Sequence, residues 1–81
     1  MERITKATLR ERAQNVNRRL RGEHHPLSVR GHYVYVEYRN GHVALDEYNN
    51  GECLRTLTVG NKREVADFLH AMMVGIDLSR A

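Results

Sequence analysis

The sequence contains few of the residues that build chemical sites. Among its 81 residues there is one cysteine, one proline and no tryptophan. A single cysteine excludes an intramolecular disulfide and any zinc site that needs two thiolates. No apolar run approaches the roughly 18 residues of a membrane-spanning helix, and the segment 1–20 lacks the hydrophobic stretch of a secretory signal. We therefore expect a protein of a reducing, cytoplasmic compartment that does not associate with a membrane.

Motifs of catalysis and metal binding are also missing. The chain has no glycine-rich phosphate loop, no nucleophile elbow and no recognisable pair of catalytic carboxylates. Nothing in the sequence places a base beside Cys53. The histidines, which do not follow a regular ligand spacing, are His24, His25, His32, His42 and His70. We expect a non-enzymatic protein with no metal, no cofactor and no small-molecule substrate.

The length of the chain is sufficient for one small domain, residues 1–81. A domain of this size buries only about 60% of the surface that its unfolded chain exposes, so its stability is marginal. With no disulfide to help, a second copy of the chain or a partner protein would add buried surface. A homodimer is therefore one of the expected states.

The segment 1–22 is predicted to form a basic amphipathic helix, because apolar residues recur at helical spacing. This apolar stripe consists of Leu9, Ala13, Val16 and Leu20. Thr8 and Glu11 have the spacing of a capping box, and Thr5 is an alternative cap about one turn earlier. Gly22 is a natural C-terminal stop for this helix.

The segment 32–59 is predicted to form a three-stranded antiparallel meander. The dipeptide Asn40-Gly41 is typical of a two-residue hairpin turn, and closing this turn places Tyr33 opposite Tyr48. One face of the hairpin then carries the core residues Val34, Val36, Tyr38, Val43 and Leu45. The opposite face is predominantly polar and is expected to be accessible if both helices cover the core face.

The third strand of the meander, residues 52–59, has no single register that places all its apolar residues on one face. A bulge near Gly51 or Arg55 would reconcile their positions. The register that continues the first hairpin makes Asp46 and Arg55 cross-strand partners.

The segment 61–78 is predicted to form the last helix. Asn61 is its expected N-cap and Glu64 occupies the capping-box position. Its apolar stripe consists of Val65, Phe68, Leu69, Met72 and Ile76. The expected fold is therefore α+β with the order α-β-β-β-α, in which two helices pack on one face of the antiparallel meander.

Positive charge is concentrated at one end of the sequence. The segment 1–22 has a net charge of +5, whereas the whole chain has a formal net charge of only +3. Arginine side chains bind phosphates and carboxylates through two parallel hydrogen bonds. The candidate nucleic-acid contacts are Arg10, Arg18, Arg19 and Arg21, together with Lys62 and Arg63. The alternative interpretation is an ordinary solvated helix face.

Three tyrosines of the polar sheet face form the second candidate site. Tyr33, Tyr35 and Tyr48 are brought together by the predicted pairing. A tyrosine has an apolar ring and a polar tip, so such a cluster is well suited to a protein interface. The alternative is that these rings only stabilise the sheet through cross-strand contacts of roughly 0.2–1 kcal/mol each.

The string 60–66 (Gly-Asn-Lys-Arg-Glu-Val-Ala), which follows three strands and opens a helix, resembles the double-stranded RNA-binding domain. That family has the same α-β-β-β-α order, and the resemblance implies that Lys62 and Arg63 contact phosphates. The sequence departs from the family pattern because the run of several lysines is reduced to these two residues. Glu64 and Asp67 follow at once.

The whole chain is also similar in style to small uncharacterised bacteriophage and prophage accessory proteins. The strings that carry this resemblance are 16–20 (Val-Asn-Arg-Arg-Leu), 45–48 (Leu-Asp-Glu-Tyr) and 62–64 (Lys-Arg-Glu) leading into Phe68-Leu69. The resemblance implies an accessory factor in the cytoplasm of a bacterial host, and some similar proteins bind host proteins.

Two functions follow from these observations. The first is a small interaction module that binds a protein of the host or phage, or a second copy of itself, through Tyr33, Tyr35 and Tyr48 or through the arginine-rich helix. The second is binding of a nucleic-acid duplex through the arginine-rich first helix. Duplex binding requires one continuous basic surface and an affinity that falls steeply with salt.

Overall fold

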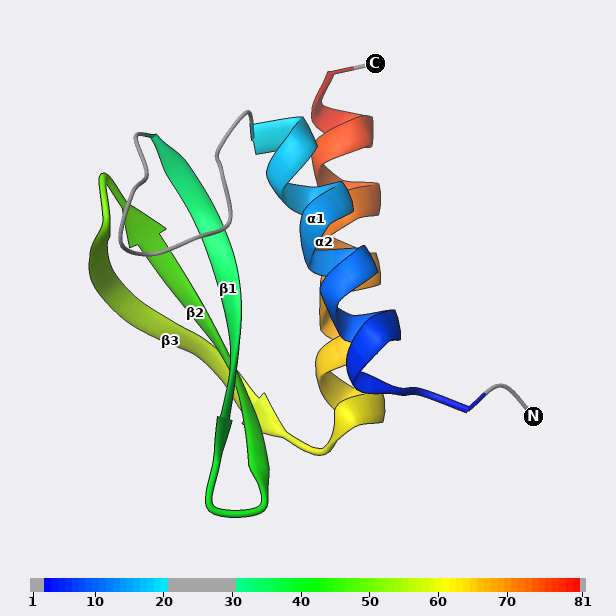
Figure 1. Ribbon diagram of the computed structural model, residues 1–81. Coiled ribbons are helices and arrows are strands. Elements are labelled where there is room, and N and C mark those ends of the chain that lie inside the picture. Colours follow the sequence, from blue (N-terminus) through cyan, green and yellow to red (C-terminus); the bar gives the residue numbers. More distant parts are fainter. Residues whose placement is uncertain (1–2, 21–30, 81) are drawn as a thin grey trace.

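The computed structural model describes residues 3–20 and 31–80 of the chain. Its elements, in order, are α1 (Lys6–Leu20), β1 (His32–Arg39), β2 (His42–Asn49), β3 (Glu52–Gly60) and α2 (Lys62–Ser79). The strands form one antiparallel sheet in the order β1-β2-β3, and the two helices lie beside each other on one side of it (Figure 1). The predicted α+β fold with the order α-β-β-β-α is confirmed.

The helix α1 begins one turn earlier than the Thr8–Glu11 pattern predicts. The Thr8 backbone N–H donates to the Thr5 hydroxyl at 3.2 Å, and the Thr5 backbone N–H donates to the Thr8 hydroxyl at 3.3 Å. Thr5 is therefore the cap, and Thr8 takes the reciprocal position that a capping box usually gives to Glu or Gln. The prediction of Thr8 as the cap is wrong because the Thr5 hydroxyl already accepts the Thr8 backbone N–H, and Thr8 itself lies within the helix. The expected stop at Gly22 lies outside the described residues.

The helix α2 begins with the predicted capping box. The Glu64 backbone N–H donates to the Asn61 side-chain oxygen at 2.8 Å, and the Asn61 backbone N–H donates to the Glu64 carboxylate at 3.1 Å. The preceding residue, Gly60, makes room for this arrangement. A Cβ atom at Gly60 would lie 2.9 Å from the nearer Glu64 carboxylate oxygen, so a side chain there would displace the carboxylate from its cap.

The first hairpin has the predicted turn and register. Asn40 and Gly41 have φ values of 41° and 83°, the positive values that the two-residue turn requires. Arg39 pairs with His42, and the ladder continues without a shift to the pair of His32 and Asn49. The position of Tyr33 opposite Tyr48 is confirmed.

The third strand contains two irregularities. Leu57 and Leu54 have no partner on β2, because the register shifts by one residue at each position. The sequence predicts one bulge near Gly51 or Arg55, and the structure has two, at Leu54 and Leu57 on either side of Arg55. As a result Arg55 lies opposite Glu47 instead of the predicted Asp46, because each extra residue moves the following side chains along the ladder.

The core lies between the helices and the sheet face that they cover. Its buried residues are Leu9, Ala13, Val16, Val34, Val43, Leu45, Val65, Ala66 and Leu69. Leu20 and Phe68, two members of the predicted stripes, are only partly buried at its periphery. Asn17 is buried beside this core although its side chain is polar, which indicates that its amide has partners within the fold.

Candidate functional site

The three candidate tyrosines lie together, but they are not equally accessible. The Tyr33 ring stacks on the Tyr48 ring with centroids 5.2 Å apart, and the Tyr35 ring meets Tyr48 edge-on at 6.2 Å. Tyr33 has 0% exposure, whereas Tyr35 and Tyr48 are half-buried. Burial raises the pKa of the Tyr33 and Tyr48 hydroxyls. The expectation that Tyr33 is accessible to a partner is wrong, because strand alternation determines which face a side chain occupies and not what covers it.

A compact polar network lies beside the tyrosines on the same sheet face. One Arg39 nitrogen lies 2.6 Å from the Asp46 carboxylate and 2.8 Å from the Glu37 carboxylate. The Thr56 hydroxyl donates to the second Asp46 oxygen at 2.7 Å, and Asp46 is completely buried. The hydrogen bond from Arg39 lowers the pKa of Glu37 below its usual value. These acidic groups are already neutralised within the fold.

A second carboxylate is held on the helix-covered face of the sheet. Glu47 lies 2.5 Å from the Arg55 side chain and 2.5 Å from the His32 ring. The hydrogen bond from Arg55 is the main cause that lowers the pKa of Glu47, against the opposing effect of burial. This ion pair joins β2 to the bulged strand β3.

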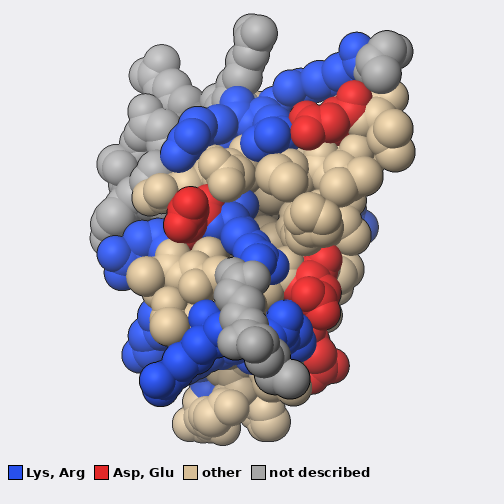
Figure 2. Space-filling view, turned by 90° about the vertical axis from the view of Figure 1, so that its right-hand side faces the viewer, with Lys and Arg blue, Asp and Glu red and all other residues tan. Residues whose placement is uncertain are grey.

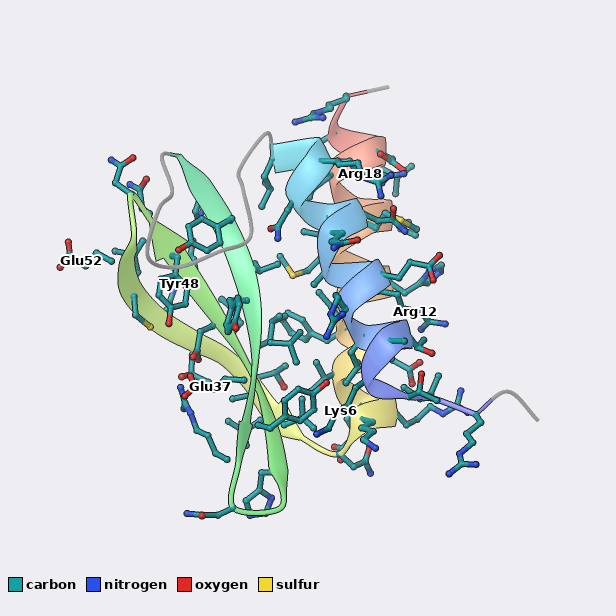
Figure 3. All side chains as sticks on the ribbon, viewed as in Figure 1. Lys6, Arg12, Arg18, Glu37, Tyr48 and Glu52 are labelled. Carbon is teal, nitrogen blue, oxygen red and sulfur yellow. The ribbon has the colours of Figure 1, made fainter. Side chains whose placement is uncertain are left out.

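The arginines of α1 do not form one uniform surface. Arg19 is paired with Asp77 of α2 at 2.8 Å, and Arg12 donates to the Ala66 carbonyl of the same helix at 3.3 Å. Arg12 and Arg18 lie on the side of α1 that is away from the sheet (Figure 3). Arg18 is exposed and has no ion pair within the described part of the chain. The helix thus uses some of its arginines to hold α2.

The other candidate cations lie at the start of α2. Lys62 and Arg63 line a hollow of about 600 Å³ that also contains Arg39 and His42 near the turn between β1 and β2. On the helical side of the molecule, basic side chains are interspersed with acidic and uncharged ones (Figure 2). Arg21, another candidate, lies outside the described residues. In this view the Lys and Arg side chains of the described residues do not form an uninterrupted basic strip.

A groove of about 420 Å³ runs between α1 and β1. Its helical wall includes Lys6, Arg10 and Gln14, and its other wall consists of residues 34–38 of β1. Consecutive strand residues point to opposite faces of a sheet, so a groove lined by all five of them follows the edge of the strand. Sequence analysis did not identify this site, because it lies between segments that are distant in the chain.

Two cations, Lys6 and Arg10, line this groove, and the acidic residue that also lines it, Glu37, is paired with Arg39. The Lys6 ammonium lies 4.7 Å from the centre of the Tyr38 ring, a cation–π contact. Burial raises the pKa of the Tyr38 hydroxyl, and the positive charge of Arg10 opposes this rise. Among the described residues neither Lys6 nor Arg10 has an acidic partner within ion-pair distance. The groove and the hollow at α2 meet at Tyr38, which lines both.

The described residues contain no group of three or more His, Cys, Asp or Glu side chains placed to hold a metal ion. None of their helices is both long and apolar enough to cross a membrane. Comparison of the chain with protein-family models, with curated proteins and with solved structures finds no match.

Proposed function

We propose that this protein is a non-enzymatic binding module that holds an acidic segment of a partner protein in the groove between α1 and β1. The observation that carries the proposal is the positive charge of Lys6 and Arg10 in this groove, which no carboxylate of the described residues neutralises. Elsewhere in the described residues Arg19, Arg39 and Arg55 are neutralised by carboxylates of the fold. A groove that keeps uncompensated cations beside apolar surface attracts a segment of opposite charge.

The apolar part of the groove supports a protein partner over a nucleic acid. Val36 is half-buried and Tyr38 is 42% exposed, so an occupant would cover accessible apolar surface. A nucleic-acid duplex instead requires a row of cations at phosphate spacing. Arg19 is already in an ion pair, and Lys62 and Arg63 lie on the other helix.

The proposed partner is a protein of a bacterial host or of a phage. This part of the proposal rests on the similarity of residues 16–20 and 45–48 to small phage and prophage accessory proteins. Acidic segments that are extended in isolation are common ligands of basic grooves, because charge accelerates their encounter and pairing fixes their orientation.

Selection from a displayed library of short random peptides tests the proposal. We expect the selected peptides to be rich in Asp and Glu, and Arg10→Glu to weaken their binding about tenfold or more, equivalent to about 1.4 kcal/mol. The matched control is Arg18→Glu, the same charge change on the exposed side of the same helix, which should leave binding nearly unchanged. The measurement is fluorescence anisotropy of each labelled peptide.

Two results would contradict this function. Equal weakening by Arg10→Glu and Arg18→Glu would show a general effect of net charge instead of a site in the groove. Binding of labelled duplex DNA or RNA that falls steeply with salt and is lost in Arg18→Glu would favour the nucleic-acid function.

A further inference from the structure

The strand that forms one wall of the groove has an unpaired edge. Within the described residues β1 pairs only with β2, because the strand order is β1-β2-β3. Beginning from the pair of Arg39 and His42 that closes the turn, every second pair exchanges backbone hydrogen bonds across the ladder. The intervening residues Val34, Val36 and Tyr38 therefore direct their N–H and C=O groups away from β2, toward the groove.

Asn17 of α1 already satisfies part of this edge. Its side-chain amide donates to the Val34 carbonyl at 2.9 Å, and its oxygen accepts from the Val34 backbone N–H at 2.7 Å. The amide thus makes the two hydrogen bonds that a neighbouring strand would make. The corresponding groups of Val36 and Tyr38 have no such partner among the described residues, and they open into the groove.

The other edge of the sheet is less suitable for pairing. β3 contains the irregularities at Leu54 and Leu57, which disturb the spacing of its backbone groups. β1 pairs with β2 in one continuous register and has no bulge. Of the two edges, β1 offers the regular row of donors and acceptors that an added strand requires.

We infer that the partner segment binds as an extended chain that adds to β1 as a fourth strand and places an acidic side chain at every second position. The inference rests on the proposed function and specifies how the groove is occupied. Residues opposite Val36 and Tyr38 share their face of the sheet, so their side chains lie on the side of Lys6 and Arg10. The alternate side chains lie on the side of Glu37 and Arg39, which are already paired with each other and offer no uncompensated cation to an acidic side chain.

The position of Asn17 limits the length of the added strand. Because its amide occupies the edge at Val34, the new strand pairs with Val36 and Tyr38 and not beyond Val34. In the other direction it leads past Tyr38 into the hollow that Lys62 lines. This path favours an acidic residue at the end of the segment as well.

The probe is an acetylated and amidated peptide of about six residues, a common strand length, in which Glu and Val alternate. Two twins carry N-methyl groups on the Glu residues or on the Val residues. N-methylation removes a backbone donor, and in a strand only one of these two sets faces β1. We expect one twin to lose binding about tenfold or more and the other to retain it, as measured by NMR titration.

Hydrogen exchange of the full chain supplies a second readout. In the bound state the amides of Val36 and Tyr38 should exchange about tenfold more slowly, while amides on the outer edge of β3 keep their rates. Loss of binding in both twins, or in neither, would overturn strand addition. Protection of Val36 and Tyr38 that appears without peptide and grows with protein concentration would place a second copy at the edge, which would also overturn it.

Failure of this inference is distinguishable from failure of the proposed function. If peptides selected from the library depend on Arg10 but protect neither Val36 nor Tyr38, strand addition is wrong and the binding function stands. If no peptide depends on Arg10, the function is wrong and the inference falls with it.

Discussion

The Tyr33 hydroxyl group is the single polar side-chain group of the described residues that is buried without a hydrogen-bond partner. Its ring is held by stacking on Tyr48. Aromatic pairs of this kind contribute about 0.5–1.5 kcal/mol beyond the area that they bury. The ring therefore stabilises the sheet, whereas the hydroxyl loses its bonds to water and gains none in return.

Removing this hydroxyl should not weaken the protein. We predict that Tyr33→Phe raises the free energy of unfolding by up to about 1 kcal/mol, because the ring is kept and an unsatisfied buried group is removed. Urea unfolding followed by circular dichroism measures the change. Tyr48→Phe, at a half-buried ring of the same cluster, serves as the control. A loss of stability on Tyr33→Phe would show that the hydroxyl has a partner.

At the level of elements, Asn17 connects α1 to the edge of β1. It is a helix residue whose amide replaces a neighbouring strand at Val34. Because both Val34 groups would otherwise be left unpaired, this contact determines how close the helix lies to the strand edge. It also occupies the edge of β1 at Val34, one of the residues that line the groove.

We predict that Asn17→Ala lowers the free energy of unfolding by about 2–3 kcal/mol, because two buried backbone groups of Val34 lose their partners. Asn15→Ala, at a half-buried position of the same helix, should change stability by less than about 0.5 kcal/mol. Thermal and urea unfolding of both variants test the difference. Equal effects of the two substitutions would mean that the Asn17 contact adds nothing beyond helix propensity.

At the scale of the whole molecule, carboxylates on both faces of the sheet are held by arginines. Glu37 is paired with Arg39 on the outer face, and Glu47 with Arg55 on the helix-covered face. Both glutamates have a pKa below the ordinary value of 4.5 because these hydrogen bonds favour the charged form. Their stabilising contribution is present at neutral pH, above the pKa of the unfolded chain. It is lost as the pH falls through the lower pKa of the folded state.

We therefore predict that the free energy of unfolding decreases between about pH 5 and about pH 3, and that Glu47→Gln makes this decrease smaller. Urea unfolding at a series of pH values measures the decrease in the free energy of unfolding. Glu52→Gln, at an exposed side chain that projects away from the sheet (Figure 3), is the control and should leave the pH dependence as it is in the parent chain. If the parent chain and Glu47→Gln lose stability equally at low pH, the ion pair of Glu47 with Arg55 is not the cause of that loss.

Some elements of the fold are predictable because their determinants are close together in the chain. The two-residue turn requires positive φ at both of its residues, which Asn40 and Gly41 adopt readily. This turn alone determines the register of β1 on β2. Asn61 and Glu64 lie one helical turn apart, so the start of α2 is readable from their spacing. The choice between Thr5 and Thr8 as the N-cap of α1 is harder, because both residues are threonines and they lie within one helical turn of each other.

The candidate site is less predictable than the fold. The position of Tyr33 opposite Tyr48 follows from the hairpin register, but the burial of Tyr33 does not. The high charge of the first segment is evident in the sequence. It does not reveal that Arg19 pairs with Asp77, whereas Arg10 lines the groove with no carboxylate partner among the described residues. The signal that sequence analysis missed is Asn17, a short amide beside the apolar stripe of a helix.

The sequence by itself determined the order of the elements, the first hairpin and the cap of α2, because each depends on residues within a few positions of one another. Only the tertiary structure decided the register of β3, the accessibility of the tyrosines and which cations lack a carboxylate partner among the described residues. Each of these depends on groups far apart in the chain, such as Asn17 with Val34 or Arg19 with Asp77. The packing of the helices on the sheet brings these groups into contact. A local sequence pattern identifies a side chain but not the distant residue that it will contact.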